Sequence, residues 1–231
     1  MSRNVLLFGA SGALGSAIGA QLVNQGFALH TAGSSSCDHS TSHLALSYQE
    51  SVNASVFASL PNLEAVVWAQ GLNASDTVVS FETADLQGLL QGNVLFIAST
   101  LQALLAAGKL CAGARLAVVS SIWQLECRPG KFSYTISKAA LQGLVKSCAL
   151  DLGPQGILIN AVLPGVVDTP MTRSRLTSEQ IAAIAGQSAL GRLPDPADIA
   201  SAVGFLVSSA NRAITGQFLT VDAGFIGLKQ I

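Results

Sequence analysis

A tyrosine and a lysine stand four residues apart in the segment YTISKAAL, at Tyr134 and Lys138. On a helix, residues at this spacing lie on one face. A lysine ammonium near a phenol favours the phenolate, which lowers the pKa of the tyrosine from about 10 toward the range of an acid/base catalyst. Taken alone, the pattern is common, and an amphipathic tyrosine on a half-buried helix is the simpler explanation.

Two further features support the chemical interpretation of this pair. Gly9, Gly12 and Gly15 follow a short apolar run and open an amphipathic segment. Glycines in this context let the backbone approach a pyrophosphate at a helix N-terminus, although they could also serve helix–strand packing alone. Ser121 ends another apolar run, thirteen positions before Tyr134. Because carboxyl ends of parallel strands face the ligand crevice, this serine could hold a substrate carbonyl while Tyr134 supplies the proton.

Apolar runs alternate with longer amphipathic segments along the whole chain. The predicted strands span 4–8, 27–32, 43–47, 64–69, 114–121, 156–164 and 217–222. The predicted helices span 12–26, 49–59, 81–109, 133–152, 178–186 and 196–209. Continuously apolar strands separated by helices predict a parallel sheet that is covered on both faces. We therefore expect one α/β domain over residues 1–231, a Rossmann-type doubly wound sheet of about seven strands.

Composition excludes several classes of protein. Half of the 231 residues are apolar, the net charge is −1, and no cluster of Lys and Arg offers a site for nucleic acid. The first apolar run, 5–8, is too short for a signal peptide, and no stretch reaches the roughly 18 apolar residues of a membrane span. Four scattered cysteines indicate reduced thiols and a cytoplasmic protein. Cys37, Asp38, His39 and His43 lie close in a Ser-rich loop segment, and we expect no metal site there.

The chain resembles the short-chain dehydrogenase/reductase family, in the single-domain branch that includes 3-oxoacyl reductases. The resemblance rests on GASGALG, GNVLFIAST, VVSSI, YTISKAAL, ILINAVLPGVVDTPM, GRLPDPADIA and ITGQFLTVDAG. It implies hydride transfer between a nicotinamide and a carbonyl or alcohol substrate. By this resemblance Tyr134 is the catalytic acid/base and Lys138 is its pKa partner and a ribose ligand. Ser121 orients the substrate, and Asn93 anchors a proton-relay water.

The resemblance also implies a cofactor site and an assembly. The implied dinucleotide contacts are Gly9, Ser11, Gly12, Ala13, Leu14, Gly33, Ser34, Ser35, Ala69, Gln70, Gly71, Tyr134, Lys138, Pro164, Gly165, Val167 and Thr169. The helices at about 81–108 and 133–152 would join a homodimer or homotetramer. The segment 171–190 and the loop 122–132 would cover the substrate. Their charged residues are either a solvated surface or a handle for an anionic substrate: Glu126, Arg128, Lys131, Arg173 and Arg175.

Several features depart from the family pattern. The glycine spacing is G-x-x-G-x-x-G, with Phe8 where threonine is usual, and WAQG at 68–71 replaces the usual NNAG. The spacing suggests an epimerase-type isomerase as one alternative. The altered WAQG suggests another, a protein that senses a dinucleotide without catalysis. The region 33–60 is short, which predicts that one helix of the fold is reduced or missing.

The end of the second predicted strand bears on the choice of dinucleotide. NAD-specific folds commonly place an acidic residue there to bind the ribose 2′-hydroxyl. Here the segment HTAGSSSC has no acid before Asp38, while Gly33, Ser34 and Ser35 offer hydrogen-bond donors. We therefore expect a preference for NADP(H) over NAD(H), with reduction as the working direction. The alternative is that 33–37 is a flexible turn without a role in selectivity. An arginine for the phosphate is missing, since only Arg3 lies nearby in sequence.

Overall fold

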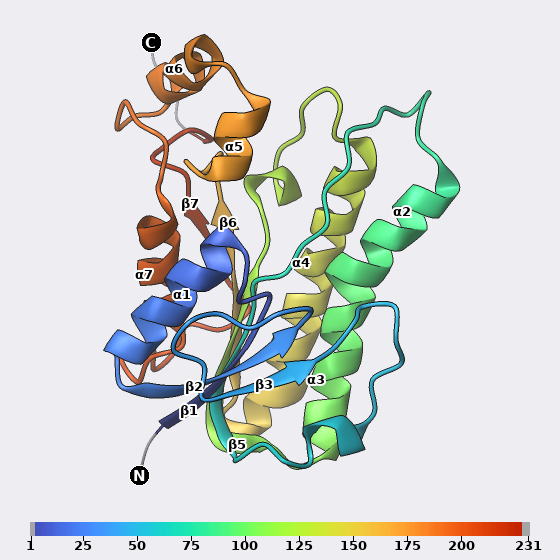
Figure 1. Cartoon of the computed structure of the whole chain (residues 1–231), viewed down its shortest axis with the longest axis vertical. Helices are drawn as coiled ribbons and strands as arrows, with labels where there is room; N and C mark the ends of the chain where they lie inside the picture. The colour runs from blue at the N-terminus through green and yellow to red at the C-terminus, as the bar shows by residue number, and fades with distance from the viewer. Residues whose placement is uncertain (1–2, 228–231) are drawn as a thin grey trace.

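Each apolar run of the sequence forms a strand of one parallel sheet. The computed structural model describes residues 3–227 (Figure 1). Its strands are β1 (Arg3–Phe8), β2 (Phe27–Gly33), β3 (Ser42–Ala45), β4 (Leu63–Trp68), β5 (Leu110–Val119), β6 (Leu158–Pro164) and β7 (Phe218–Val221). Their order is β3-β2-β1-β4-β5-β6-β7, and every pairing is parallel. The predicted seven-stranded, Rossmann-type sheet is therefore confirmed.

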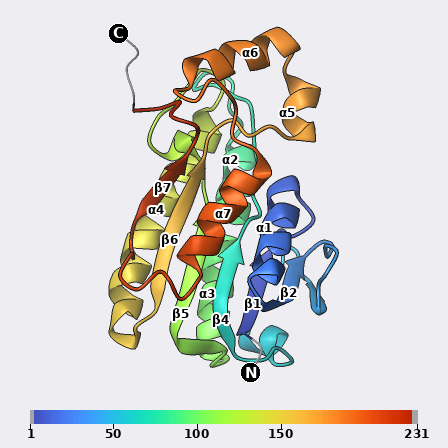
Figure 2. The same cartoon turned by 90° about the vertical axis from the view of Figure 1, so that its left-hand side faces the viewer.

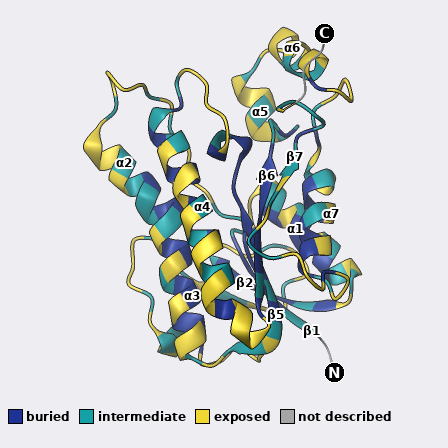
Figure 3. Ribbon diagram, turned by 180° about the vertical axis from the view of Figure 1, so that it is seen from behind, coloured by how far each residue is buried: buried dark blue, intermediate teal, exposed yellow. Residues whose placement is uncertain are grey.

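Helices cover both faces of this sheet. One face carries α1 (Ala13–Asn24) and α7 (Pro196–Leu206), which pack side by side (Figure 2). The other face carries α2 (Thr83–Leu90), α3 (Phe96–Ala106) and α4 (Phe132–Leu152). Two short helices, α5 (Pro170–Arg175) and α6 (Ser178–Gln187), lie beyond the carboxyl ends of the strands, within the predicted covering segment. Burial follows these layers, because the strands are dark blue and the outer helix faces yellow (Figure 3).

An aromatic cluster fills the core between the sheet and α3. Phe8 and Trp68 are register partners on β1 and β4, and their rings stack with centroids 5.7 Å apart at an angle of 4°. Phe57 and Phe96 meet the ring of Phe8 edge-on, at 6.4 and 5.7 Å. The indole Nε1 of Trp68 donates to Thr100 Oγ1 at 2.9 Å, so its polar atom is satisfied. Two departures from the family pattern therefore form one packed pair, and Trp68 belongs to the core.

The long helical pattern predicted at 81–109 is interrupted. A π-helical turn, Gln91–Leu95, separates α2 from α3. Asn93 lies in this turn, and its side chain bonds to the backbone of Leu72 on the neighbouring segment. Such turns are often found at functional sites. The interruption depends on a contact between distant segments, which the periodicity of the sequence does not report.

The region between β3 and β4 lacks a regular α-helix. The predicted helix at 49–59 is reduced to a 3₁₀ turn, Ala54–Phe57, so the reduction expected from the short 33–60 region is confirmed. Asn53 caps this turn, since its Oδ1 accepts from Ser55 N at 3.0 Å. Phe57 is fully buried there and completes the aromatic cluster. In this region, a short turn with one buried side chain, Phe57, covers the core where a longer helix was expected.

One helical stretch meets the length and composition of a membrane span. Thr83–Ala106 has a mean hydropathy of 1.5 in its most apolar window, and 50% of that window is buried in the protein. Ile97, Leu101 and Leu104 point into the core beneath α3. A core helix that packs on a sheet passes the same test, so this stretch is explained by the fold.

Candidate active site

The turn between β1 and α1 requires glycine at two positions. Gly9 has a φ of +74°, and a Cβ there would lie 2.5 Å from the backbone nitrogen of Gln70. A Cβ on Gly15 would collide with the carbonyl of Gly9. These close approaches bring the glycine turn against the end of β4. The alternative that these glycines serve packing is thus partly right. The same packing also forms one edge of the adjoining pocket.

The N-terminus of α1 is suited to an anion. Gly12 caps this helix, and its carbonyl accepts from Ser16 N at 2.8 Å. The preceding N–H groups, including those of Ala13 and Leu14, have no intrahelical acceptor. The first turn contains no acidic residue. Free N–H groups and the positive end of the helix dipole together favour a phosphate.

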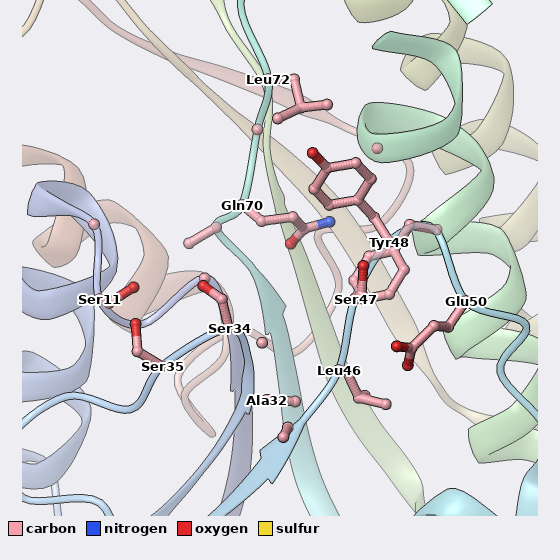
Figure 4. A pocket seen from close by; sticks show the side chains of 18 residues that line it. Ser11, Ala32, Ser34, Ser35, Leu46, Ser47, Tyr48, Glu50, Gln70 and Leu72 are labelled. Atoms are coloured by element: carbon pink, nitrogen blue, oxygen red, sulfur yellow. The ribbon is translucent and has the colours of Figure 1, made fainter. Parts of the chain in front are cut away.

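A pocket of about 530 Å³ opens beside this turn (Figure 4). Nine of the expected dinucleotide contacts line it: Gly9, Ser11, Gly12, Gly33, Ser34, Ser35, Ala69, Gln70 and Gly71. The sequence interpretation missed several other lining residues, among them Leu46, Ser47, Tyr48, Glu50, Leu72, Gly92 and Phe96. Most of them come from the segment after β3 and from the helical layer, and Leu72 comes from the segment after β4. Only the strand order, which sets β3 beside β2, could have pointed to them.

Four further expected contacts, Pro164, Gly165, Val167 and Thr169, lie at or after the carboxyl end of β6, outside this pocket. Gly165 N donates to Val221 O at 3.0 Å, which joins this end to β7. Thr169 caps α5, since its Oγ1 accepts from Thr172 N at 3.2 Å. Val167 is buried, and Pro164 is the last residue of β6. This segment adjoins the end of β5, where the catalytic candidates begin.

Ser121, Tyr134 and Lys138 converge at the end of β5. Ser121 follows the strand and caps a 3₁₀ turn, with its Oγ accepting from Trp123 N at 3.2 Å. Tyr134 lies in the first turn of α4, and the Ser121 hydroxyl is close enough to its phenol to influence its pKa. Lys138 Nζ lies 5.7 Å from the centroid of the Tyr134 ring and donates to Val119 O at 3.3 Å. The three groups therefore lie together in one site, in which Ser121 and Lys138 are buried and Tyr134 is half-buried.

The electrostatics of this site differ from the expectation. Burial raises the pKa of Tyr134 above its usual value of 10.0, and the neighbouring Ser121 hydroxyl only partly opposes this shift. Burial also lowers the pKa of Lys138 from 10.5 to about 8. The predicted lowering of the tyrosine pKa is thus wrong for the protein itself. The desolvation penalty of the phenolate is larger than its stabilisation by the neighbouring groups.

Asn93 acts as a clamp beside this site. Its Oδ1 accepts from Leu72 N at 2.7 Å, and its Nδ2 donates to Leu72 O at 3.0 Å and to Ser137 Oγ at 3.0 Å. A Cβ on Gly71 would lie 3.4 Å from Lys138 Nζ and 3.7 Å from Asn93 Oδ1. The clamp therefore fixes the segment that joins the pocket to the catalytic candidates. A role for Asn93 as a water anchor stays a prediction.

Lys131, one of the charged residues of the loop that was expected to cover the substrate, lies beside Tyr134. It is buried, and its Nζ donates to Asn73 Oδ1 at 2.7 Å and to Ala74 O at 2.9 Å. Its Nζ also lies 5.5 Å from the centroid of the Tyr134 ring. The solvated-surface interpretation is therefore wrong for this residue. Lys131 ties the loop after β4 to the beginning of α4.

Two arginines considered as anion ligands have other partners. Arg173 forms a two-pronged ion pair with Asp168, at 2.7 and 2.6 Å, which holds α5 to the preceding loop. Arg3 donates to the carbonyl of Gln25, and its guanidinium lies 4.3 Å from the centroid of the Phe27 ring. Arg3 is at the amino end of β1, away from the pocket at the carboxyl ends. It is therefore not a ligand for a ribose phosphate.

Comparison with known proteins agrees with the fold. Residues 47–226 match the family described as Enoyl-(Acyl carrier protein) reductase. The uncharacterized oxidoreductase YmfI of Bacillus subtilis is 29% identical over 242 residues, which cover 97% of this chain and 99% of that protein. Cyclopentanol dehydrogenase of Comamonas testosteroni is 44% identical over 108 residues, 46% of this chain and 43% of the relative. For that relative, the match spans less than half of its length.

Solved structures extend the comparison to the whole chain. A short-chain dehydrogenase family protein of Francisella tularensis superposes with a TM-score of 0.90 at 22% identity, covering 99% of this chain and 100% of that one. Gluconate 5-dehydrogenase of Burkholderia cenocepacia, in complex with NADP and tartrate, gives a TM-score of 0.87 at 20% identity, covering 98% and 96%. The chain belongs to the short-chain dehydrogenase/reductase family.

Proposed function

We propose that the protein is an oxidoreductase that transfers a hydride between NADP(H) and a carbonyl/alcohol pair. The observation that carries this proposal is the convergence of Ser121, Tyr134 and Lys138 in one site at the end of β5. A phenol, a hydroxyl and an amine at this place can hold a substrate oxygen and exchange its proton.

The residues present fit a dinucleotide. Gly9 and Gly15 leave no room for a Cβ, so the turn packs closely on itself and on the segment after β4, beside the pocket. The N-terminus of α1 offers free N–H groups for the pyrophosphate. Residues of the β1–α1 turn, the end of β2 and the end of β4 would hold the adenosine half. Pro164, Val167 and Thr169, at the end of β6, would border the nicotinamide.

The chain's own groups would do the proton chemistry. A bound nicotinamide would supply or accept the hydride. Tyr134 keeps its proton at neutral pH because burial raises its pKa, which suits a proton donor in carbonyl reduction. Ser121 would hold the substrate oxygen close to the phenol. Lys138 carries positive charge below its pKa of about 8, and that charge would stabilise the phenolate left by proton transfer.

The proposed preference for NADP(H) rests on charge at the end of β2. No carboxylate lies at that strand end, and Ser34 and Ser35 line the pocket there. Glu50 also lines the pocket, but from the opposite side (Figure 4). A carboxylate at Ser34 would repel a 2′-phosphate, so Ser34→Asp should shift kcat/KM toward NADH. A wild-type ratio that favours NADH would contradict the preference.

The test of the proposed activity is a panel of ketones, acetoacetyl thioesters and keto sugars, assayed with NADPH. Tyr134→Phe should lower turnover by about a hundredfold or more, the low end for a positioned general acid. Its dinucleotide dissociation constant should stay close to that of the wild type. Activity near the wild-type level in this variant would refute the role of Tyr134. Binding without turnover of any carbonyl would favour a dinucleotide sensor instead.

Assembly into a homodimer or homotetramer is part of the proposal, as is a cytoplasmic location. The helices α2 to α4 and the turn between them expose large apolar side chains. Leu150 is 79% exposed, Leu95 53% and Leu105 36%. Exposed apolar groups on neighbouring helices favour burial against a second copy. A monomeric mass in sedimentation equilibrium would contradict this part.

A further inference from the structure

The side chain of Gln70 has both polar atoms buried and without a protein partner. Within residues 3–227, neither Nε2 nor Oε1 of its amide has a hydrogen bond, and neither atom is accessible to solvent. Folded proteins rarely leave a buried amide unsatisfied, because its desolvation is not compensated. An unsatisfied amide that lines a pocket therefore indicates a ligand with matching groups.

The surroundings of Gln70 define the shape of that ligand. Its backbone lies against Gly9, and Figure 4 shows its side chain extending into the pocket between Ser34 and Tyr48. Beyond the amide, the pocket is lined by apolar and aromatic groups: Leu46, Tyr48, Leu72 and Phe96. A flat, mostly apolar ring with hydrogen-bonding groups on one edge suits this combination.

We infer that the amide of Gln70 reads the adenine edge of the dinucleotide. This inference rests on the proposed function and adds the group that selects the base. A glutamine amide pairs with adenine in two bonds, donating to N7 through Nε2 and accepting from the N6 amino group through Oε1. Both orphan atoms would then be satisfied at once. A single hydroxyl or a phosphate oxygen would leave one of the two atoms without a partner.

Charge supports a neutral edge as the partner. Glu50 lines the same pocket but is exposed, so water already solvates its carboxylate. The two polar atoms of the Gln70 amide, by contrast, are shielded from solvent and have no partner within residues 3–227. The free-energy gain on ligand binding is therefore concentrated at Gln70. Its replacement should change the choice of base more than any other side chain of the pocket.

The test compares NADPH with its hypoxanthine analogue, in which an oxygen replaces the N6 amino group. Dissociation constants come from isothermal titration calorimetry without substrate, so the readout is independent of activity. The wild type should bind the adenine form at least about fivefold more tightly, the low end for a two-bond amide–base pair. Gln70→Leu should reduce this ratio to below about twofold, because neither bond can form.

Two controls keep the result interpretable. Ser47→Ala removes another polar side chain of the same pocket and should leave the base ratio unchanged. Gln70→Leu should unfold in urea at the same concentration as the wild type or higher, because it removes an unsatisfied amide. Should Gln70→Leu fail to fold, Gln70→Met provides the same comparison with an unbranched side chain.

Each outcome decides the inference. A ratio that falls only in the Gln70 variants supports the assignment. An equal ratio in the wild type and Gln70→Leu would overturn it while dinucleotide binding, and hence the proposed function, stands. Absence of binding of either dinucleotide to the wild type would overturn both.

Discussion

Replacing Lys138 with methionine should make the protein more stable while removing the cation of the proposed catalytic site. The side chain is 3% exposed, and burial lowers its pKa from 10.5 to about 8. At pH 7 the folded state therefore carries a buried charge that the unfolded chain solvates fully. A shift of this size corresponds to a penalty of about 3 kcal/mol. Loss of the hydrogen bond to Val119 O removes about 1 kcal/mol, which leaves a net gain of about 2 kcal/mol.

The gain should depend on pH. Below about 8 both the folded and the unfolded lysine are protonated, so the penalty is complete. Between about 8 and 10.5 the folded state has lost its proton while the unfolded chain still holds one, so wild-type stability rises with pH. The advantage of Lys138→Met should accordingly shrink to near zero by a pH of about 10.

Urea unfolding at both pH values, followed by tryptophan fluorescence in reducing buffer, measures this difference. Comparing the two proteins at each pH cancels the titration of every other group. The reasoning fails if Lys138→Met is less stable than the wild type at neutral pH. It also fails if the stability difference is the same under both conditions, since packing alone would then explain it.

Two other predictions concern the framework of the site. Phe8→Ala should lower the free energy of unfolding by about 3–5 kcal/mol, since it empties the centre of the aromatic cluster, and Phe8→Leu should cost clearly less. Urea titrations that show equal costs would contradict a role for the ring stack. Asn93→Ala should destabilise by about 2–4 kcal/mol, because it strands the N–H and C=O of Leu72. It should also weaken dinucleotide binding in calorimetry, and unchanged affinity would show that the clamp does not shape the pocket.

The parallel sheet was predictable because its strands are continuous apolar runs and its helices are amphipathic. The π-helical turn between α2 and α3 was not predictable, since 81–109 has one continuous helical pattern. That turn lies where Asn93 bonds to Leu72, a residue twenty-one positions earlier. Local periodicity contains no information about such a contact. The same limit applies to the 3₁₀ turn that replaces the helix expected at 49–59.

Some features of the candidate site were likewise predictable from the sequence, and others were not. Motif spacing was enough to select Ser121, Tyr134 and Lys138, because strand ends and helix faces determine where they lie. The direction of the Tyr134 pKa was beyond it, since that direction depends on how deeply the ring is buried. Lysine is usually a surface residue, but Lys131 is buried, and its Nζ donates to the loop after β4. Gln70 was already among the expected dinucleotide contacts, but the unpaired state of its amide depends on the fold around it and not on the sequence motif.

The stacked pair of Phe8 and Trp68 has a consequence for how this sequence can change over generations. Each ring is fully buried and forms a wall of the space that holds the other. A smaller residue at either position alone leaves a void, whereas a joint change can refill the space from both strands. The two positions are therefore expected to covary among homologues, with an aromatic at one accompanied by an aromatic at the other. Trp68 directly precedes Ala69 and Gln70, which line the pocket. A substitution at Trp68 that shifts the end of β4 would therefore also move these two pocket residues.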